Sequence, residues 1–146
     1  QGAQTPGFLS AWIEESSAKE LLQSWSDLTG IDLIRLGTTA EADEIRETSF
    51  AQPLLVAAGL LSYRALGNPA SNFIAGHSVG EITACAIAEV LAPSAALELV
   101  RQRGLSMAKV ASQVETGMSA VLGGDRDDDG SSRFEQPLRS LEEAGV

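Results

Sequence analysis

The sequence predicts an α/β fold, with helices on the faces of a parallel sheet. Residues 73–75 form a short apolar run, which predicts a strand. A turn at residues 76–80 follows, and residues 81–91 then have a helical pattern. Ahead of the strand, residues 48–65 are apolar nearly all round, which is typical of a buried helix. A buried helix, a strand, a sharp turn and a helix in this order favour the α/β class.

Length, composition and charge narrow the class of protein. The chain has 146 residues, about one domain, and 44% of them are hydrophobic, enough to bury a core. Its formal net charge is −10, from 20 acidic and 10 basic residues, which disfavours a nucleic-acid partner because such a surface needs a basic stripe. No apolar run approaches the roughly 20 residues that cross a membrane, and no leader is visible, so we expect a cytoplasmic protein without a membrane partner.

The counts of cysteine and histidine restrict metal binding and disulfide formation. The single cysteine, Cys85, excludes an internal disulfide and a zinc site built from cysteines. The single histidine, His77, excludes a site built from several histidines. We therefore expect no metal.

The remaining elements are predicted from periodicity and from helix-end signals. Helices are expected at residues 9–24, from a capped acidic turn at residues 39–45, at residues 48–65 with Pro53 in the first turn, and at residues 94–111 after Pro93. A turn and short strand are expected at residues 116–123, an Asp-rich loop at residues 125–132, and a helix at residues 133–144 ending near Gly145. The loop-like start and the end at Val146, where another strand is due, suggest an incomplete chain.

The turn at residues 76–80 has the Gly-x-Ser-x-Gly spacing of a nucleophile elbow. Its two glycines let strand and helix approach closely, and the turn then exposes the Ser78 hydroxyl. Backbone N–H groups at the start of the following helix can stabilise a developing oxyanion. An ordinary strand-to-helix turn would use the same glycines, so the motif leaves that alternative open.

A serine nucleophile needs a base, and the sequence offers a poor one. His77 adjoins Ser78, and neighbouring side chains on such a turn point apart, so we expect His77 to pack or hydrogen-bond beneath the turn. The chain then contains a nucleophile without its base.

Four motifs, at residues 1–4, 50–55, 76–81 and 100–107, together resemble those of malonyl-CoA:acyl carrier protein transacylases and the related acyltransferase domains of fatty-acid and polyketide synthases. Residues 76–81, Gly-His-Ser-Val-Gly-Glu, are similar to the elbow of that family. Residues 1–4, Gln-Gly-Ala-Gln, resemble the end of its glutamine loop. Residues 50–55 resemble its Thr-Gln-Pro helix start, and residues 100–107 its Arg-Gly-x-x-Met segment. The resemblance covers residues 1 to about 123.

The resemblance implies a role for each matching residue. Ser78 would be the nucleophile that accepts the acyl group. The oxyanion hole would come from Val79, through its backbone N–H, and from Gln1. Arg103 would pair with the free carboxylate of the malonyl group, for which a guanidinium is well suited. Gln52 is a candidate to line the site.

Two assignments stay open on the sequence. Residues 99, 103 and 107 share one helix face and residues 97, 101 and 105 share another, so periodicity does not choose between Arg101 and Arg103. Gln52 is equally compatible with a polar residue at a helix start. His77 is a second candidate to line the site.

The resemblance implies the front part of a hydrolase-like parallel sheet in residues 1–117 and the start of a small ferredoxin-like α+β subdomain in residues 118–146. It implies transfer of malonyl from malonyl-CoA to the phosphopantetheine thiol of acyl carrier protein, without a cofactor. The alternatives are a serine hydrolase or thioesterase with the same elbow, and a catalytically incomplete fragment that acts as a binding module.

Overall fold

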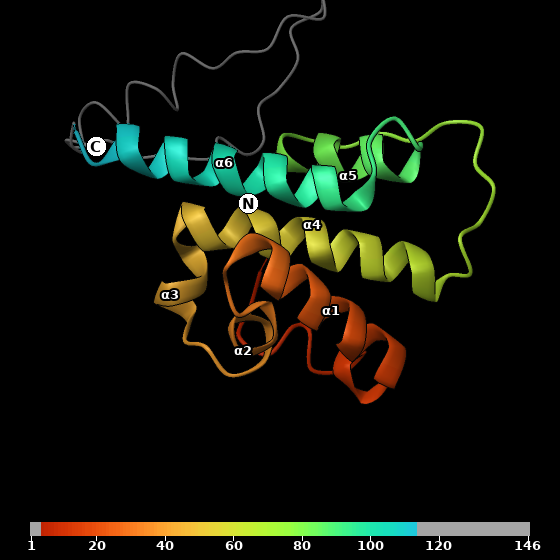
Figure 1. Cartoon of the computed structure of the whole chain (residues 1–146), viewed down its shortest axis with the longest axis horizontal. Coiled ribbons are helices and arrows are strands. Elements are labelled where there is room, and N and C mark those ends of the chain that lie inside the picture. The colour runs from red at the N-terminus through yellow and green to blue at the C-terminus, as the bar shows by residue number, and fades with distance from the viewer. Residues whose placement is uncertain (1–3, 114–146) are drawn as a thin grey trace, which may run out of the picture. The chain divides into compact units, whose positions relative to one another are not determined.

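The computed structural model describes residues 4–113, which lie in the compact unit Gln1–Val114. These residues form helices and no strand (Figure 1). The elements in chain order are η1 (Trp12–Glu14), α1 (Ser16–Thr29), α2 (Leu33–Thr38), α3 (Ala42–Arg46), α4 (Thr48–Ala65), α5 (Val79–Ile87) and α6 (Pro93–Ala111). No helix among the described residues combines the length and the apolar character needed to cross a membrane.

Helix α4 is the centre of this unit. It has the predicted bounds, Thr48–Ala65, and contacts every other α-helix of the described residues. Its side chains are buried on several sides, including Leu54, Val56, Ala57 and Leu61. The nearly all-round apolar pattern is therefore explained by partners around the whole helix. Pro53 is the sixth residue of α4, so the prediction that it lies in the first turn is wrong.

Helices α5 and α6 approach α4 closely at two glycines. A Cβ atom on Gly59 of α4 would lie 2.7 Å from the Thr83 Cγ2 atom of α5. A Cβ atom on Gly104 of α6 would lie 3.0 Å from the Thr48 carbonyl oxygen. Figure 1 shows α4 and α6 side by side and antiparallel. Pro93 is the first residue of α6, as predicted from its fixed φ and missing N–H.

The N-terminal helices pack on another side of α4. The helix predicted at residues 9–24 is η1 followed by α1, which ends at Gly30 in the left-handed conformation, with φ 68°. Ser26 joins α1 to the next helix: its Oγ accepts from the Leu33 N–H at 3.0 Å. Asp32 caps α2 through a bond from the Arg35 N–H at 2.9 Å.

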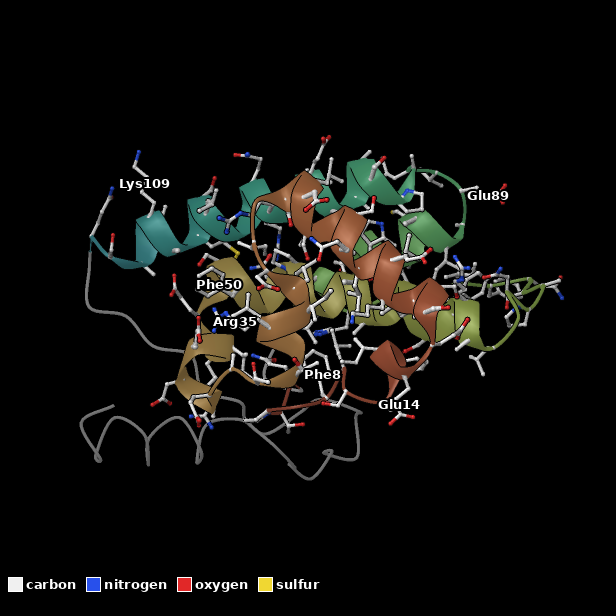
Figure 2. All side chains as sticks on the ribbon, turned by 60° about the horizontal axis from the view of Figure 1, so that its bottom comes forward. Phe8, Glu14, Arg35, Phe50, Glu89 and Lys109 are labelled. Atoms are coloured by element: carbon white, nitrogen blue, oxygen red, sulfur yellow. The ribbon has the colours of Figure 1, made fainter. Side chains whose placement is uncertain are left out.

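A bidentate ion pair links α2 to α3. The two terminal nitrogens of Arg35, labelled in Figure 2, bind the two carboxylate oxygens of Glu44 at 3.0 and 2.5 Å. The hydrogen bond from Arg35 lowers the pKa of Glu44, and the same bond raises the pKa of Arg35. The predicted cap at residue 39 is wrong, because Thr39 ends α2 and α3 begins after Glu41, without a side-chain cap.

The predicted strand at residues 73–75 is not formed in the described part of the chain. The Phe73 side chain there is 94% exposed. A strand requires a neighbour that accepts and donates its backbone hydrogen bonds. Residues 4–113 contain no strand, so the apolar run forms no ladder within the described residues. The elements predicted at residues 116–123, 125–132 and 133–144, and the cap at Gly145, lie outside the described residues.

Candidate functional site

The turn at Ser78 has the backbone geometry of a strained elbow. Ser78 has φ 55° and ψ −115°, in the left-handed half of φ space that residues with a Cβ rarely adopt. The turn closes through bonds from the Gly80 N–H to the His77 carbonyl at 2.9 Å and from the Glu81 N–H to the Ser78 carbonyl at 3.1 Å. The strain falls on the one residue that the motif marks as the nucleophile.

The Ser78 hydroxyl is exposed and takes no part in capping α5. Serine at the residue before a helix usually accepts a hydrogen bond from one of the first backbone N–H groups. Ser78 occupies that position and makes no such bond. Val79 is the first residue of α5, so its N–H belongs to the groups that have no partner within the helix. An exposed hydroxyl and an unused N–H therefore adjoin at the elbow.

Gly76 makes this geometry sterically possible. A Cβ atom on Gly76 would lie 2.0 Å from the Gly80 carbonyl oxygen and 2.4 Å from the Glu81 nitrogen, both backbone atoms. The chain entering the turn thus touches the start of α5 directly. A Cβ atom on Gly80 would meet nothing within 4 Å, so the two glycines of the motif have different roles in the described residues.

His77 does not pack beneath the turn. Its side chain is exposed, so the prediction of a packed or hydrogen-bonded ring is wrong for the described part of the chain. Gln1, predicted as half of the oxyanion hole, lies outside the described residues. Gln4 of the same loop is 8% exposed, and its Nε2 donates to the Ile45 carbonyl at 3.1 Å. The place of Gln4 in the glutamine motif is the sequence feature that could have indicated this anchoring role.

Gln52 and Arg103 lie together, 51 positions apart in the sequence. The Arg103 Nη1 donates to the Gln52 Oε1. Gln52 is fully buried in α4, and its Nε2 donates to the Met107 Sδ at 3.1 Å. Both polar ends of the Gln52 amide are therefore satisfied, and one of them holds the guanidinium of a half-buried arginine. No hydrogen bond or ion pair among the described residues joins this pair to Ser78.

The structure separates the two arginines that periodicity left equivalent. Arg101 donates from Nη1 to the Ser49 carbonyl at 3.0 Å, whereas Arg103 binds the Gln52 side chain. Arg101 is thus bound to the backbone of α4. Arg103 keeps further N–H donors beyond the one used by Gln52.

An open cavity of about 780 Å³ lies elsewhere, among α1, α4 and the turn between α5 and α6. It is lined mainly by apolar side chains together with Arg64 and Glu89. None of the predicted site residues lines it. We therefore place the candidate site at the elbow and at the Gln52–Arg103 pair.

Comparison with solved structures gives the class of the fold. The chain aligns with a crystal structure named as MCAT from Mycobacterium tuberculosis with a TM-score of 0.81 and 44% identity. The alignment covers 99% of this chain and 47% of the other. This similarity supports an α/β acyltransferase fold, although residues 4–113 by themselves form helices without a sheet. No protein-family model matches the chain.

A curated relative gives the particular family. The malonyl CoA-acyl carrier protein transacylase of M. tuberculosis strain H37Rv is 48% identical over 141 residues, which is 93% of this chain and 46% of the relative. The resemblance seen in the four motifs is confirmed: this chain is related to the malonyl CoA-acyl carrier protein transacylases. It spans about half the length of the curated relatives that it matches.

Proposed function

We propose that the protein containing this chain is a malonyl-CoA:acyl carrier protein transacylase of fatty-acid biosynthesis. It would move malonyl from malonyl-CoA to the phosphopantetheine thiol of acyl carrier protein. The observation that carries the proposal is the elbow: Ser78 is exposed, strained and not used as a cap, directly before the first N–H of α5. The names of the relatives agree with this chemistry.

The reaction would proceed through two acyl transfers. The Ser78 Oγ attacks the thioester carbonyl carbon, while the Val79 N–H and Gln1 stabilise the oxyanion. The coenzyme A thiol leaves, and Ser78 holds malonyl as an ester. The carrier thiol then attacks this ester and frees Ser78. Neither transfer changes an oxidation state, so we propose no redox cofactor and no metal.

A general base must take the proton of the Ser78 hydroxyl. His77 is the single histidine of the chain and adjoins Ser78 on the turn, where we expect neighbouring side chains to point apart. We propose that His77 lines the site without acting as the base. The base then lies outside these 146 residues.

Arg103 would select malonyl by binding its carboxylate. A guanidinium offers several N–H donors in a planar fork, and the Gln52 Oε1 accepts from only one nitrogen of Arg103, Nη1. The remaining donors are free to bind a carboxylate, and the fixed charge attracts it. Gln52 thus lines the site as the residue that orients Arg103.

The partners in this proposal are malonyl-CoA and acyl carrier protein, with no nucleic acid or membrane. A neighbour with a TM-score of 0.67 and 31% identity, aligned over 75% of this chain and 37% of its own, is named as a malonyl-transacylase in complex with a type II PKS acyl-carrier protein.

We further propose a cytoplasmic location. We also propose the front part of a hydrolase-like parallel sheet in residues 1–117 and the start of a ferredoxin-like subdomain in residues 118–146.

Labelling of the full-length protein tests the nucleophile. Radioactive malonyl-CoA should leave one covalent label, and Ser78→Ala should abolish it because no other hydroxyl occupies the elbow. Ser10→Ala, a substitution at an exposed serine in the N-terminal segment, is the control and should keep the label. Label that survives Ser78→Ala would refute the assignment.

Selectivity separates the transacylase from a hydrolase of neutral acyl groups, which has no need of this cation. Arg103→Ala should reduce malonyl transfer about 10- to 100-fold more than acetyl transfer, the size of a lost charge-assisted bond. Lys109 is an exposed cation near the end of α6 (Figure 2), and Lys109→Ala should leave the ratio of malonyl to acetyl transfer unchanged. Equal losses with both acyl groups would favour the hydrolase.

The intact mass of the natural protein separates the enzyme from a binding module. We expect a mass well above the 15.3 kDa of this chain, because a transacylase must also supply the base. A natural product of 15.3 kDa would favour the non-catalytic alternative.

A further inference from the structure

Helix α4 contains a backbone carbonyl that its own helix leaves without a donor. In an α-helix the carbonyl of one residue accepts from the N–H four residues later. Pro53 stands four residues after Ser49 and has no N–H. Ser49 is 4% exposed, so there is little room for water to supply the missing donor. A buried carbonyl without a donor is costly, and one must come from elsewhere in the molecule.

Arg101 of α6 supplies this donor. Its Nη1 donates to the Ser49 carbonyl at 3.0 Å, across 52 positions of sequence. The bond is charge-assisted, and it lies beside the close approach of the two helices at Gly104. One turn further along α6, the missing Cβ of Gly104 leaves room for the Thr48 carbonyl at 3.0 Å and the Ser49 Cα at 3.2 Å. The contact therefore fixes where α6 lies along α4.

The same register places Arg103 against Gln52. Arg103 is two residues after Arg101, and Gln52 is three residues after Ser49 and directly before Pro53. The Arg103 Nη1 binds the Gln52 Oε1, and the other end of the amide binds Met107. A slip of α6 along α4 would break both arginine contacts together. Pro53 thus leaves a carbonyl on α4 without a donor, and the observed register of α6 supplies one from Arg101.

We propose that Arg101 is a positioning residue: it donates to the carbonyl that Pro53 leaves free, and so holds α6 in the register in which Gln52 orients Arg103. The consequence for substrate binding rests on the proposed function, since it takes Arg103 as the cation for the malonyl carboxylate. Arg101 supplies the donor that position 53 lacks because it is a proline. This donor exchange does not depend on the proposed function and is tested separately.

A double-mutant cycle on the full-length protein tests the donor exchange. Arg101→Met removes the donor and keeps most of the apolar stem, and it should raise the equilibrium constant of unfolding about tenfold. Pro53→Ala restores an N–H at position 53. In that background Arg101→Met should cost less than about threefold, because the restored N–H serves the Ser49 carbonyl. Lys109→Met in both backgrounds is the matched control and should show no coupling.

Equal costs of Arg101→Met with and without Pro53→Ala would overturn the donor exchange. If Arg101→Met fails to fold, Arg101→Lys replaces it in the cycle, because its ammonium reaches less far and donates from one point. It should then give the same sign of coupling with a smaller amplitude.

Kinetics test the positioning role itself. Arg101→Met should raise the KM for malonyl-CoA several-fold more than it lowers kcat, and should leave acetyl transfer nearly unchanged. Adding Pro53→Ala should restore the KM, which a general loss of stability would not predict. An unchanged KM for malonyl-CoA would overturn the positioning role even if unfolding shows coupling. If Arg103→Ala leaves malonyl selectivity intact, the proposed function fails, and the unfolding cycle still decides the donor exchange.

Discussion

Substitution of Gly76 by alanine should damage the elbow far more than the same change at Gly80. The new Cβ would lie 2.0 Å from the Gly80 oxygen and 2.1 Å from the Gly80 carbonyl carbon, where ordinary contact begins at 3.4 Å. These are backbone atoms, so relief requires the turn to open by on the order of 1 Å. That movement displaces Ser78 and the first N–H groups of α5 together.

The displacement should have two measurable effects, a loss of stability and a loss of acylation rate. Forcing an extra methyl into a filled space costs about 1–3 kcal/mol of stability, and the exposed position of Gly76 favours the lower end. A misplacement of about 1 Å at a reacting group costs about 100-fold in rate. Gly76→Ala should therefore lose a modest amount of stability and about two orders of magnitude in the rate of Ser78 acylation.

Single-turnover acylation of the full-length protein by malonyl-CoA, followed by intact mass, measures this rate. Gly80→Ala is the matched control, since its Cβ meets nothing within 4 Å and alanine favours a helix by about 0.5–1 kcal/mol over glycine. A Gly76→Ala rate within about threefold of the native rate would refute the reasoning. So would a Gly80→Ala variant that loses as much.

Two further predictions concern the N-terminal helices. Ser26→Ala should cost about 0.5–1.5 kcal/mol in urea unfolding, because it removes one of the two acceptors of the N–H of the fully buried Leu33, which also donates to the Ile31 carbonyl at 2.9 Å. Ser24→Ala on the exposed side of α1 should stay within about 0.5 kcal/mol, and an equal loss there would contradict the role of Ser26. Arg35 lowers the pKa of Glu44 below its ordinary 4.5, so the pair stabilises the fold above that pH and loses this contribution as the pH falls through the lowered pKa. The stability gap between the native protein and Glu44→Gln should shrink as the pH falls below 4.5 and through the lowered pKa of Glu44, and a gap independent of pH would contradict the assignment.

The sequence predicted the helices that are defined by local pattern. The apolar pattern gave both ends of α4, and Pro93 marked the first residue of α6. The strand at residues 73–75 could not be predicted in the same way, because a strand exists only with a hydrogen-bonding neighbour. The Phe73 side chain is 94% exposed, and residues 4–113 contain no strand that could pair with its apolar run.

The candidate site was predictable where a motif constrains one residue, and less so where two segments meet. The Gly-x-Ser-x-Gly spacing predicts the backbone of Ser78, which has φ 55°. Arg101 remained indistinguishable from Arg103 because periodicity describes one helix at a time. The signal that separates them lies in another helix: Pro53 stands four residues after Ser49 and removes its donor.

The pairing of α4 with α6 also has a consequence for synthesis. The contacts of Gln52 and Ser49 with α6 join residues 51 to 55 positions apart. At about 5–20 residues per second, α4 leaves the ribosome about 3 to 10 s before the part of α6 that completes these contacts. During that interval the side of α4 that faces α6 and the free Ser49 carbonyl have no partner, although the N-terminal helices already exist. We therefore expect α4 to be the segment of the nascent chain that most needs a chaperone.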